Sequence, residues 1–240
     1  MLIKQDLAGP PATVIASSRN GPSVTTASPS RNKPCPHGAR IRSGCARCVL
    51  LDVLMPYSLA DLHALYAHQG DEQYGGEAVS QCEHALQCAW FAEQDGAPEH
   101  LVIAALLHDV GHLLAGQQED DIAHGIDDRH EAVAMAALKP LFAENVLAPI
   151  ALHVAAKRYL CTVQADYCAS LSAASRQSLA LQGGPMQASE ALRFASNPYA
   201  AAAIALRTYD DRAKIPQLAT PTLDHYFARA HALSVRAGLR

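Results

Sequence analysis

From about Ser58 onward, apolar residues recur at intervals of three and four, the spacing that places them on one face of an α-helix. The segments with this pattern are residues 77–92, 99–115, 130–138, 143–160, 188–195, 198–213 and 223–237. Glycine and proline clusters, such as Gly75-Gly76 and Asn197-Pro198, separate them. Alternating runs of β-branched residues, which indicate strands, do not occur. The pattern therefore predicts an all-α fold, a bundle of about seven helices.

The chain before this bundle has a different composition. Residues 1–34 are rich in Pro, Ser, Thr and Gly and show no periodicity, which predicts a flexible tail. Residues 35–57 form a short segment that could hold a structural zinc ion, and residues 58–240 form the helical domain. The four zinc ligands would be Cys35, His37, Cys45 and Cys48. Only one residue separates the first pair, so reduced cysteines in a linker are the alternative.

Composition excludes several classes of protein and partner. Half of the residues are hydrophobic and 18% are charged, so a wholly disordered chain is excluded. The net charge of −4 gives no basic footprint for nucleic acid. We find no apolar run of the roughly 18–20 residues that spans a bilayer and no secretory signal, so no membrane partner is expected. The seven cysteines do not form a disulfide framework, which favours the reducing cytoplasm. The oligomeric state stays open.

Histidine and aspartate residues mark successive helical segments. His108-Asp109 closes an apolar run, where two polar side chains are costly unless they are paired or ligated. Adjacent residues on a helix point about 100° apart, so Asp109 can bridge two metal ions. The complete set is His84, His108, Asp109, His130, His153 and Asp210. A single buried histidine is usually a core residue, but six such ligands together predict a centre with two metal ions. Imidazoles and carboxylates suit iron, manganese or zinc.

Further polar residues share helix faces with these ligands. His112 lies one turn beyond His108, and Lys157 lies one turn beyond His153. Glu77 and His84 fall on one polar stripe of the segment 77–92. Near the end of the chain, another stripe contains Arg207, Asp210 and Lys214. The alternative for the cations is an ordinary position at a helix surface.

The order of these motifs resembles the HD-domain superfamily, and the added histidines resemble its binuclear branch. Six segments are similar to the HD-domain oxygenases of organophosphonate catabolism, which are relatives of myo-inositol oxygenase. These segments are residues 74–87, 108–112, 127–131, 153–160, 182–185 and 209–214. The resemblance covers roughly residues 60 to 235.

The resemblance implies a mixed-valent Fe(II)/Fe(III) centre, with O2 as co-substrate. One iron would be held by His84, His108, Asp109 and Asp210. The other would be held by Asp109, His130 and His153, so that Asp109 bridges the two ions. The substrate would be a small 1-hydroxyalkylphosphonate, and cleavage of its C–P bond would release phosphate and a carboxylic acid. No catalytic residue beyond the metal ligands is implied.

The resemblance also implies a set of substrate-binding residues. Lys157 and Arg207 would supply cationic donors to the phosphonate, with His112 and two serines as further donors. Glu77 would hold a substrate ammonium group, and Tyr74 would cover the open iron until substrate arrives. The full set is Tyr74, Glu77, His112, Lys157, Ser175, Ser178 and Arg207.

Two alternatives to the oxygenase remain at this stage. One is a metal-dependent HD-domain phosphohydrolase that acts on a phosphoester through a metal-bound hydroxide, because the same ligands would serve. The sequence Tyr74-x-x-Glu77, which a hydrolase does not need, favours the oxygenase. The other is a binding module with a structural metal, and the cations beside the ligands argue against it.

Overall fold

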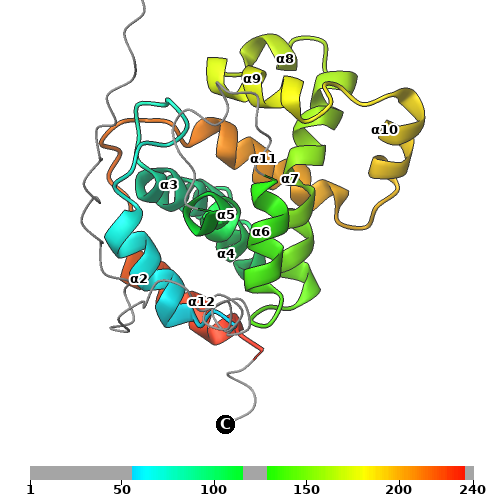
Figure 1. The fold of residues 1–240 in the computed structure, drawn as a ribbon. Helices are drawn as coiled ribbons and strands as arrows, with labels where there is room; N and C mark the ends of the chain where they lie inside the picture. The colour runs from blue at the N-terminus through cyan, green and yellow to red at the C-terminus, as the bar shows by residue number, and fades with distance from the viewer. Residues whose placement is uncertain (1–55, 116–128, 236–240) are drawn as a thin grey trace, which may run out of the picture. The chain divides into compact units, whose positions relative to one another are not determined.

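Eleven helices make up the part of the chain that the computed structural model describes, residues 56–115 and 129–235 (Figure 1). In these ranges the pairing of strands is limited to one isolated antiparallel bridge between Gln73 and Ser80. The all-α fold class is therefore confirmed. The predicted tail, residues 1–34, and the predicted Cys/His segment, residues 35–57, lie outside the described residues apart from the last two positions.

Four helices form the centre of the described bundle. They are α3 (Gln81–Gln94), α4 (Glu99–Leu107), α7 (Glu144–Val163) and α11 (Ala200–Arg212). Helix α4 is apolar on every side, and residues 101–107 are all buried, as expected for a helix enclosed by others. It packs on α3 and α7, and α11 packs on the same two helices. The central helices therefore hold side by side three stretches of chain that are far apart in sequence, residues 81–107, 144–163 and 200–212.

The other helices cover this centre. Near the two ends of the described chain, α2 (Leu59–Gln69) packs on α12 (Leu223–Leu233), and α12 also packs on α4. Helices α5 (Val110–Ala115) and α6 (His130–Leu138) pack on each other, and α6 also packs on α7. The shorter helices beyond α7 are α8 (Tyr167–Ser170), α9 (Ala173–Leu181) and α10 (Ala188–Ala195). Figure 1 shows α8, α9 and α10 grouped at one end of α7 and α11.

The helices expected over 143–160, 198–213 and 223–237 differ from the observed ones by a few residues at their ends. Two predicted helices differ more. The helix expected from residue 77 begins at Gln81, because the Ser80 hydroxyl accepts from the backbone amide of Glu83 and caps the helix. Glu77 therefore lies in the preceding loop, and the expected helical stripe from Glu77 to His84 is wrong. The helix expected over 99–115 is interrupted at His108 and Asp109.

The interruption has a local cause. The Nδ1 atom of His108 lies 2.9 Å from the carbonyl oxygen of Ala105. That oxygen is the acceptor that the amide of Asp109 would use in a continuous helix. The His108 side chain competes for it, and the two polar residues occupy the turn between α4 and α5. Helices α2, α8 and α9 were not among the predicted segments, since their apolar pattern is short or weak.

Helix α7 departs from the sequence expectation about membranes. With 20 residues and a mean hydropathy of 1.3, it is long and apolar enough to cross a bilayer by length and composition. More than half of that stretch is buried in the structure, however, and it carries His153 and Lys157 on its inward face. These features are those of the core helix of a folded domain.

Candidate metal centre

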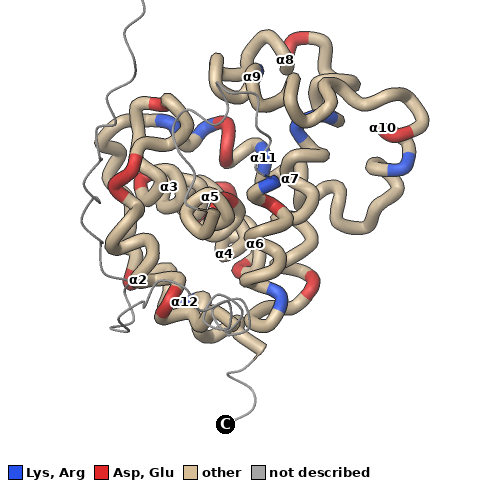
Figure 2. The backbone as a smooth tube through the Cα atoms, in the orientation of Figure 1, with Lys and Arg blue, Asp and Glu red and all other residues tan. Residues whose placement is uncertain are grey.

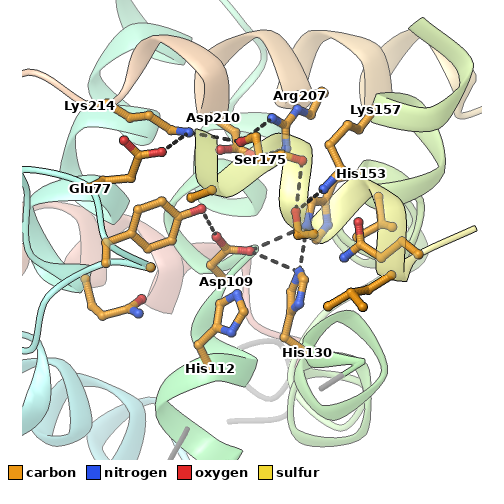
Figure 3. Close-up of a pocket in the computed structure, with 18 residues that line it drawn as sticks. Glu77, Asp109, His112, His130, His153, Lys157, Ser175, Arg207, Asp210 and Lys214 are labelled. Atoms are coloured by element: carbon orange, nitrogen blue, oxygen red, sulfur yellow. Dashed lines mark hydrogen bonds and ion pairs between the residues drawn. The ribbon is translucent and has the colours of Figure 1, made fainter. Parts of the chain in front are cut away.

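The carboxylate of Asp109 lies between two groups of imidazoles. Its Oδ2 atom is 3.2 Å from His108 Nε2 and 3.7 Å from His84 Nε2. Its Oδ1 atom is 3.5 Å from the Nε2 atoms of both His130 and His153 (Figure 3). One carboxylate therefore faces a different histidine pair with each oxygen, which is the arrangement expected of a bridging ligand.

Asp210 completes the group around His84 and His108. Its Oδ1 atom is 3.6 Å from His84 Nε2, and its Oδ2 atom is 3.9 Å from His108 Nε2. The structure thus brings together all six predicted metal ligands, from helices α3, α6, α7 and α11 and from the turn between α4 and α5.

Three of the histidines are oriented by backbone carbonyls. The Nδ1 atoms of His84, His108 and His153 lie 2.7–2.9 Å from the carbonyl oxygens of residues 213, 105 and 150. A carbonyl only accepts, so each Nδ1 carries the hydrogen and each Nε2 presents a lone pair toward the carboxylates. Burial lowers the pKa of His84 to about 4 and that of His153 to about 3, which keeps both rings neutral. Neutral imidazole is the form that binds metal ions.

Several buried atoms in this cluster have no hydrogen-bond partner within the described ranges. They are Nε2 of His108, Oδ1 of Asp109 and Oδ1 of Asp210. Unpartnered buried lone pairs of this kind are costly unless a cation accepts them. The donor set therefore fits a pair of metal ions.

Gly111 explains how helix α6, which carries the ligand His130, comes close to helix α5. A side-chain carbon at this position would lie 2.0 Å from the carbonyl oxygen of His130, which is closer than atoms can approach. Only glycine lets α5 meet the first residue of α6 at this distance. The glycine after His108-Asp109 thus positions His130.

A pocket opens beside the cluster. All seven predicted substrate-binding residues line it, together with four of the ligands. Charged residues of both signs gather where α11 passes α7 (Figure 2). Gln182 and Lys214 also line this pocket, although neither was among the predicted substrate-binding residues. The spacing of Lys214 after Arg207 and Asp210 could have indicated it, whereas the position of Gln182 depends on tertiary contacts.

Lys157 brings an ammonium group into the wall of the pocket. Its side chain is only 3% exposed, and Nζ donates to the hydroxyl of Ser178 over 2.8 Å. No carboxylate pairs with it among the described residues. Burial, and then the charge of Arg207, lower the pKa of Lys157 to about 8. The group is therefore suited to an anionic ligand.

Arg207 has a different environment. Its Nη1 atom donates to Asp210 Oδ2 over 2.6 Å, and Nη2 donates to Asp211. Its Nε atom donates to the hydroxyl of Tyr167 over 3.1 Å, and Nη2 also reaches Ser175 at 3.4 Å. Arg207 thus fixes the ligand Asp210 from behind while it lines the pocket.

Glu77 and Lys214 form an ion pair at the other side of the pocket. Lys214 Nζ lies 2.9 Å from Glu77 Oε1 and also donates to the hydroxyls of Ser172 and Ser175. The carboxylate that the sequence assigned to a substrate ammonium is therefore paired within the chain in this structure.

Tyr74 covers one edge of the cluster. Its hydroxyl donates to Asp109 Oδ2 over 2.7 Å, and its ring stacks on His84 with the ring centres 3.8 Å apart. Burial, and then the charge of Asp109, raise the pKa of Tyr74 well above its usual value, so the phenol keeps its proton. Tyr74 therefore lies against two of the predicted ligands.

A buried His-Asp pair at the end of an apolar helix, in an all-α bundle with further histidines, defines a protein of the HD-domain class. The sequence model of this family, described as HD domain, matches residues 82–171. The chain is 43% identical over 169 residues to a hydroxymethylphosphonate dioxygenase of Gimesia maris, which covers 70% of this chain and 84% of that protein.

It is also 40% identical over 162 residues to a [1-hydroxy-2-(trimethylamino)ethyl]phosphonate dioxygenase (glycine-betaine-forming) of Leisingera caerulea. This second match covers 68% of the chain and 83% of the relative. The chain belongs to the HD domain family, and the family predicted from the six motif segments is confirmed.

Proposed function

We propose that this protein is an iron-dependent oxygenase that cleaves the C–P bond of a small 1-hydroxyalkylphosphonate with O2. The products are phosphate and a carboxylic acid. Two relatives named phosphonate dioxygenases support the reaction class. The observation that carries the proposal is the position of Asp109, whose two oxygens face separate histidine pairs beside the ammonium group of Lys157.

The chain supplies two sets of ligands to this proposed centre. His84, His108 and Asp210 would hold one iron, His130 and His153 would hold the other, and Asp109 would bridge them. A bound mixed-valent iron pair supplies the one-electron chemistry with O2 that no amino-acid side chain provides. The backbone carbonyls behind the histidines fix the ring orientations before any metal arrives.

The phosphonate group would bind between Lys157 and the serines of α9. The ammonium of Lys157 lies 2.8 Å from the hydroxyl of Ser178, so both donors can reach one phosphonate group. The hydroxyl of Ser175 and the imidazole of His112 line the same pocket (Figure 3). A buried cation strengthens this interaction because the surroundings are of low dielectric. The anion would thus be held with its C–P bond beside Asp109.

Tyr74 and Glu77 would control the access of substrate to the metal ligands, from the side of the pocket opposite Lys157. The hydroxyl of Tyr74 donates a hydrogen bond to Oδ2 of Asp109, the proposed bridging carboxylate. Glu77 lies three residues later in the same loop. The backbone amide of Glu77 donates to the carbonyl of Tyr74 over 2.7 Å, so the two residues move together. Substrate that displaces Tyr74 would also shift Glu77 away from Lys214.

The proposal includes a cytoplasmic location. All four cysteines of the described residues are free thiols, which suits a reducing compartment. A small organophosphonate is the proposed partner, and the expectations about nucleic acid and membranes remain predictions.

The test is an assay of phosphate release with and without oxygen. Purified protein is loaded with Fe(II) in the presence of ascorbate. It is then incubated separately with hydroxymethylphosphonate, with [1-hydroxy-2-(trimethylamino)ethyl]phosphonate and, as a control, with a phosphomonoester. We expect phosphate from at least one phosphonate only when O2 is present, with one O2 consumed per phosphate. Equal release under strict anaerobiosis, or release from the phosphomonoester alone, would support the phosphohydrolase instead.

A further inference from the structure

Gln87 of helix α3 holds the chain segment that follows α11. Its side-chain nitrogen donates to the carbonyl oxygen of Ile215 over 2.7 Å, and its side-chain oxygen accepts from the backbone amide of Ile215 over 3.0 Å. Gln87 is only 1% exposed, whereas residues 213–215 lie beyond the end of α11 and belong to no helix. One buried amide therefore fixes a non-helical residue through both its donor and its acceptor.

His84 holds the same segment from the same face of α3. It precedes Gln87 by three residues, so the two side chains are neighbours on the helix surface. The Nδ1 atom of His84 donates to the carbonyl oxygen of Ala213 over 2.8 Å. Residues 213 and 215 are thus both bonded to α3, one by a predicted metal ligand and the other by Gln87.

The acceptor behind His84 differs from those behind the other oriented histidines. His108 and His153 each bond a carbonyl oxygen only three residues earlier in the chain. Those two acceptors are fixed by the local geometry of a helix. The acceptor of His84 lies 129 positions away in the sequence, so its place depends on what holds residues 213–215 against α3. Gln87 supplies that hold.

We propose that Gln87 is a positioning residue of the metal centre. By fixing Ile215, it keeps the carbonyl of Ala213 where it orients the ring of His84, whose Nε2 atom lies 3.6 Å from Oδ1 of Asp210. A hydrogen bond to the outer nitrogen of a ligating imidazole sets the ring orientation and makes the other nitrogen a better ligand. The consequence for iron rests on the proposed function, whereas the positioning of His84 does not.

Lys214 lies between the two anchored residues and extends the effect of Gln87 into the pocket. Its ammonium group lies 2.9 Å from a carboxylate oxygen of Glu77 and donates to the hydroxyls of Ser172 and Ser175 (Figure 3). The backbone on both sides of Lys214 is bonded to α3, so its side chain enters the pocket from a fixed position. Gln87 does not line the pocket itself and therefore acts on it through Lys214.

The test compares three variants of the full-length chain. Gln87→Met removes both hydrogen bonds to Ile215 and keeps an unbranched side chain of similar length. Gln87→Asn keeps the amide on a shorter side chain that no longer reaches Ile215, and it provides the same test if the methionine variant does not fold. The matched control is Tyr226→Phe, which removes a hydrogen bond to Glu93 near the other end of α3.

The first measurement is made on the metal-free protein by ¹⁵N NMR of the imidazole rings. Wild-type His84, His108 and His153 should each show an Nδ1 proton that is protected from exchange, because each donates to the carbonyl of a buried residue. In the Gln87 variants we expect the protected signal of His84 to be lost, while those of His108 and His153 remain. Tyr226→Phe should keep all three signals.

The second measurement is iron binding, followed by anaerobic competition with a chelator. We expect the Gln87 variants to bind one of the two Fe(II) ions about tenfold more weakly, which is the lower end of the effect of changes behind a metal-binding histidine. Tyr226→Phe should bind both ions as the wild type does. Excess iron should restore phosphate release in the Gln87 variants, because every proposed ligand is still present.

Three results would overturn parts of this proposal. A His84 signal that stays protected in the Gln87 variants overturns the positioning. Equal loss of protection at all three histidines, or weaker iron binding in Tyr226→Phe as well, shows general loosening of the fold and overturns it too. A His84 signal that is lost without any change in iron binding overturns the role at the metal centre. Neither measurement needs turnover, so a protein that behaves as expected but releases no phosphate contradicts the proposed function alone.

Discussion

Replacing Lys157 by methionine removes one ammonium group from the pocket and keeps an apolar side chain of similar length. In the structure this ammonium is buried, donates to Ser178 and has no carboxylate partner among the described residues. A phosphonate would therefore form a direct ion pair that Lys157 lacks among the described residues. We expect the variant to bind substrate much more weakly while its fold and metal ligands stay intact.

The size of the effect follows from the contact that is lost. A hydrogen bond to a charged group contributes about 1.5–3 kcal/mol. Since about 1.4 kcal/mol corresponds to a factor of ten in an equilibrium constant, KM should rise about 10- to 100-fold. Ser178→Ala is the matched control: it removes an uncharged hydroxyl from the same contact and leaves the ammonium in place, so its KM should rise less than that of Lys157→Met.

The assay combines initial rates of phosphate release with metal analysis and thermal unfolding. We expect unchanged iron content and no loss of thermal stability in Lys157→Met, because the substitution removes a buried charge without a carboxylate partner. An unchanged KM accompanied by loss of iron or a lower unfolding temperature would refute the reasoning. That result would assign Lys157 a structural role.

Three further predictions concern the ligands and the fold. Asp109→Asn should lose at least one iron per chain and should abolish phosphate release, because the bridging carboxylate becomes a neutral amide. Metal analysis measures the iron content, and full occupancy of both sites would contradict the bridging role. Gly111→Ala should destabilise the protein by about 1–3 kcal/mol in urea unfolding and lower the iron content, since the new methyl group collides with the backbone of His130. A variant as stable as the wild type would contradict this prediction and show that the contact relaxes easily. Arg229→Gln should cost about 1 kcal/mol or less at neutral pH, because Arg229 joins α12 to the partly exposed Glu99 of α4. The hydrogen bond from Arg229 lowers the pKa of Glu99 in the folded state. The stabilisation is therefore present above the pKa of Glu99 in the unfolded chain, and it is lost as the pH falls through the pKa of Glu99 in the folded protein. A stability difference between the variant and the wild type that persisted in acid would contradict this prediction.

The cluster of histidines and aspartates was predictable because its signals are local. Each predicted ligand lies on or beside an apolar helical segment, and helical spacing alone relates His108 to His112 and His153 to Lys157. The helix bounds of α6 and α10 also follow directly from the periodicity. The order of these local motifs along the chain then indicated the family.

The parts that sequence reasoning missed depend on contacts between distant segments. The ion pair of Glu77 and Lys214 joins residues 137 positions apart, and no local pattern signals it. The error about Glu77 arose because the apolar spacing continues past the N-cap, so periodicity alone does not show where the helix begins. Similarly, Tyr167 reaches Arg207 from a four-residue helix that is too short to have a detectable period. The zinc segment, residues 35–57, stays a prediction.

The most direct test of the central claim follows oxygen atoms from O2 into the products. Hydroxymethylphosphonate is converted in the presence of ¹⁸O₂ and ordinary water, and the phosphate and formate are analysed by mass spectrometry. The products contain two more oxygen atoms than the substrate, so an oxygenase places label from O2 in them. Our account predicts labelled products from ¹⁸O₂ and no turnover without it. Unlabelled phosphate, released at the same rate in the absence of O2, would contradict the account and identify a hydrolase.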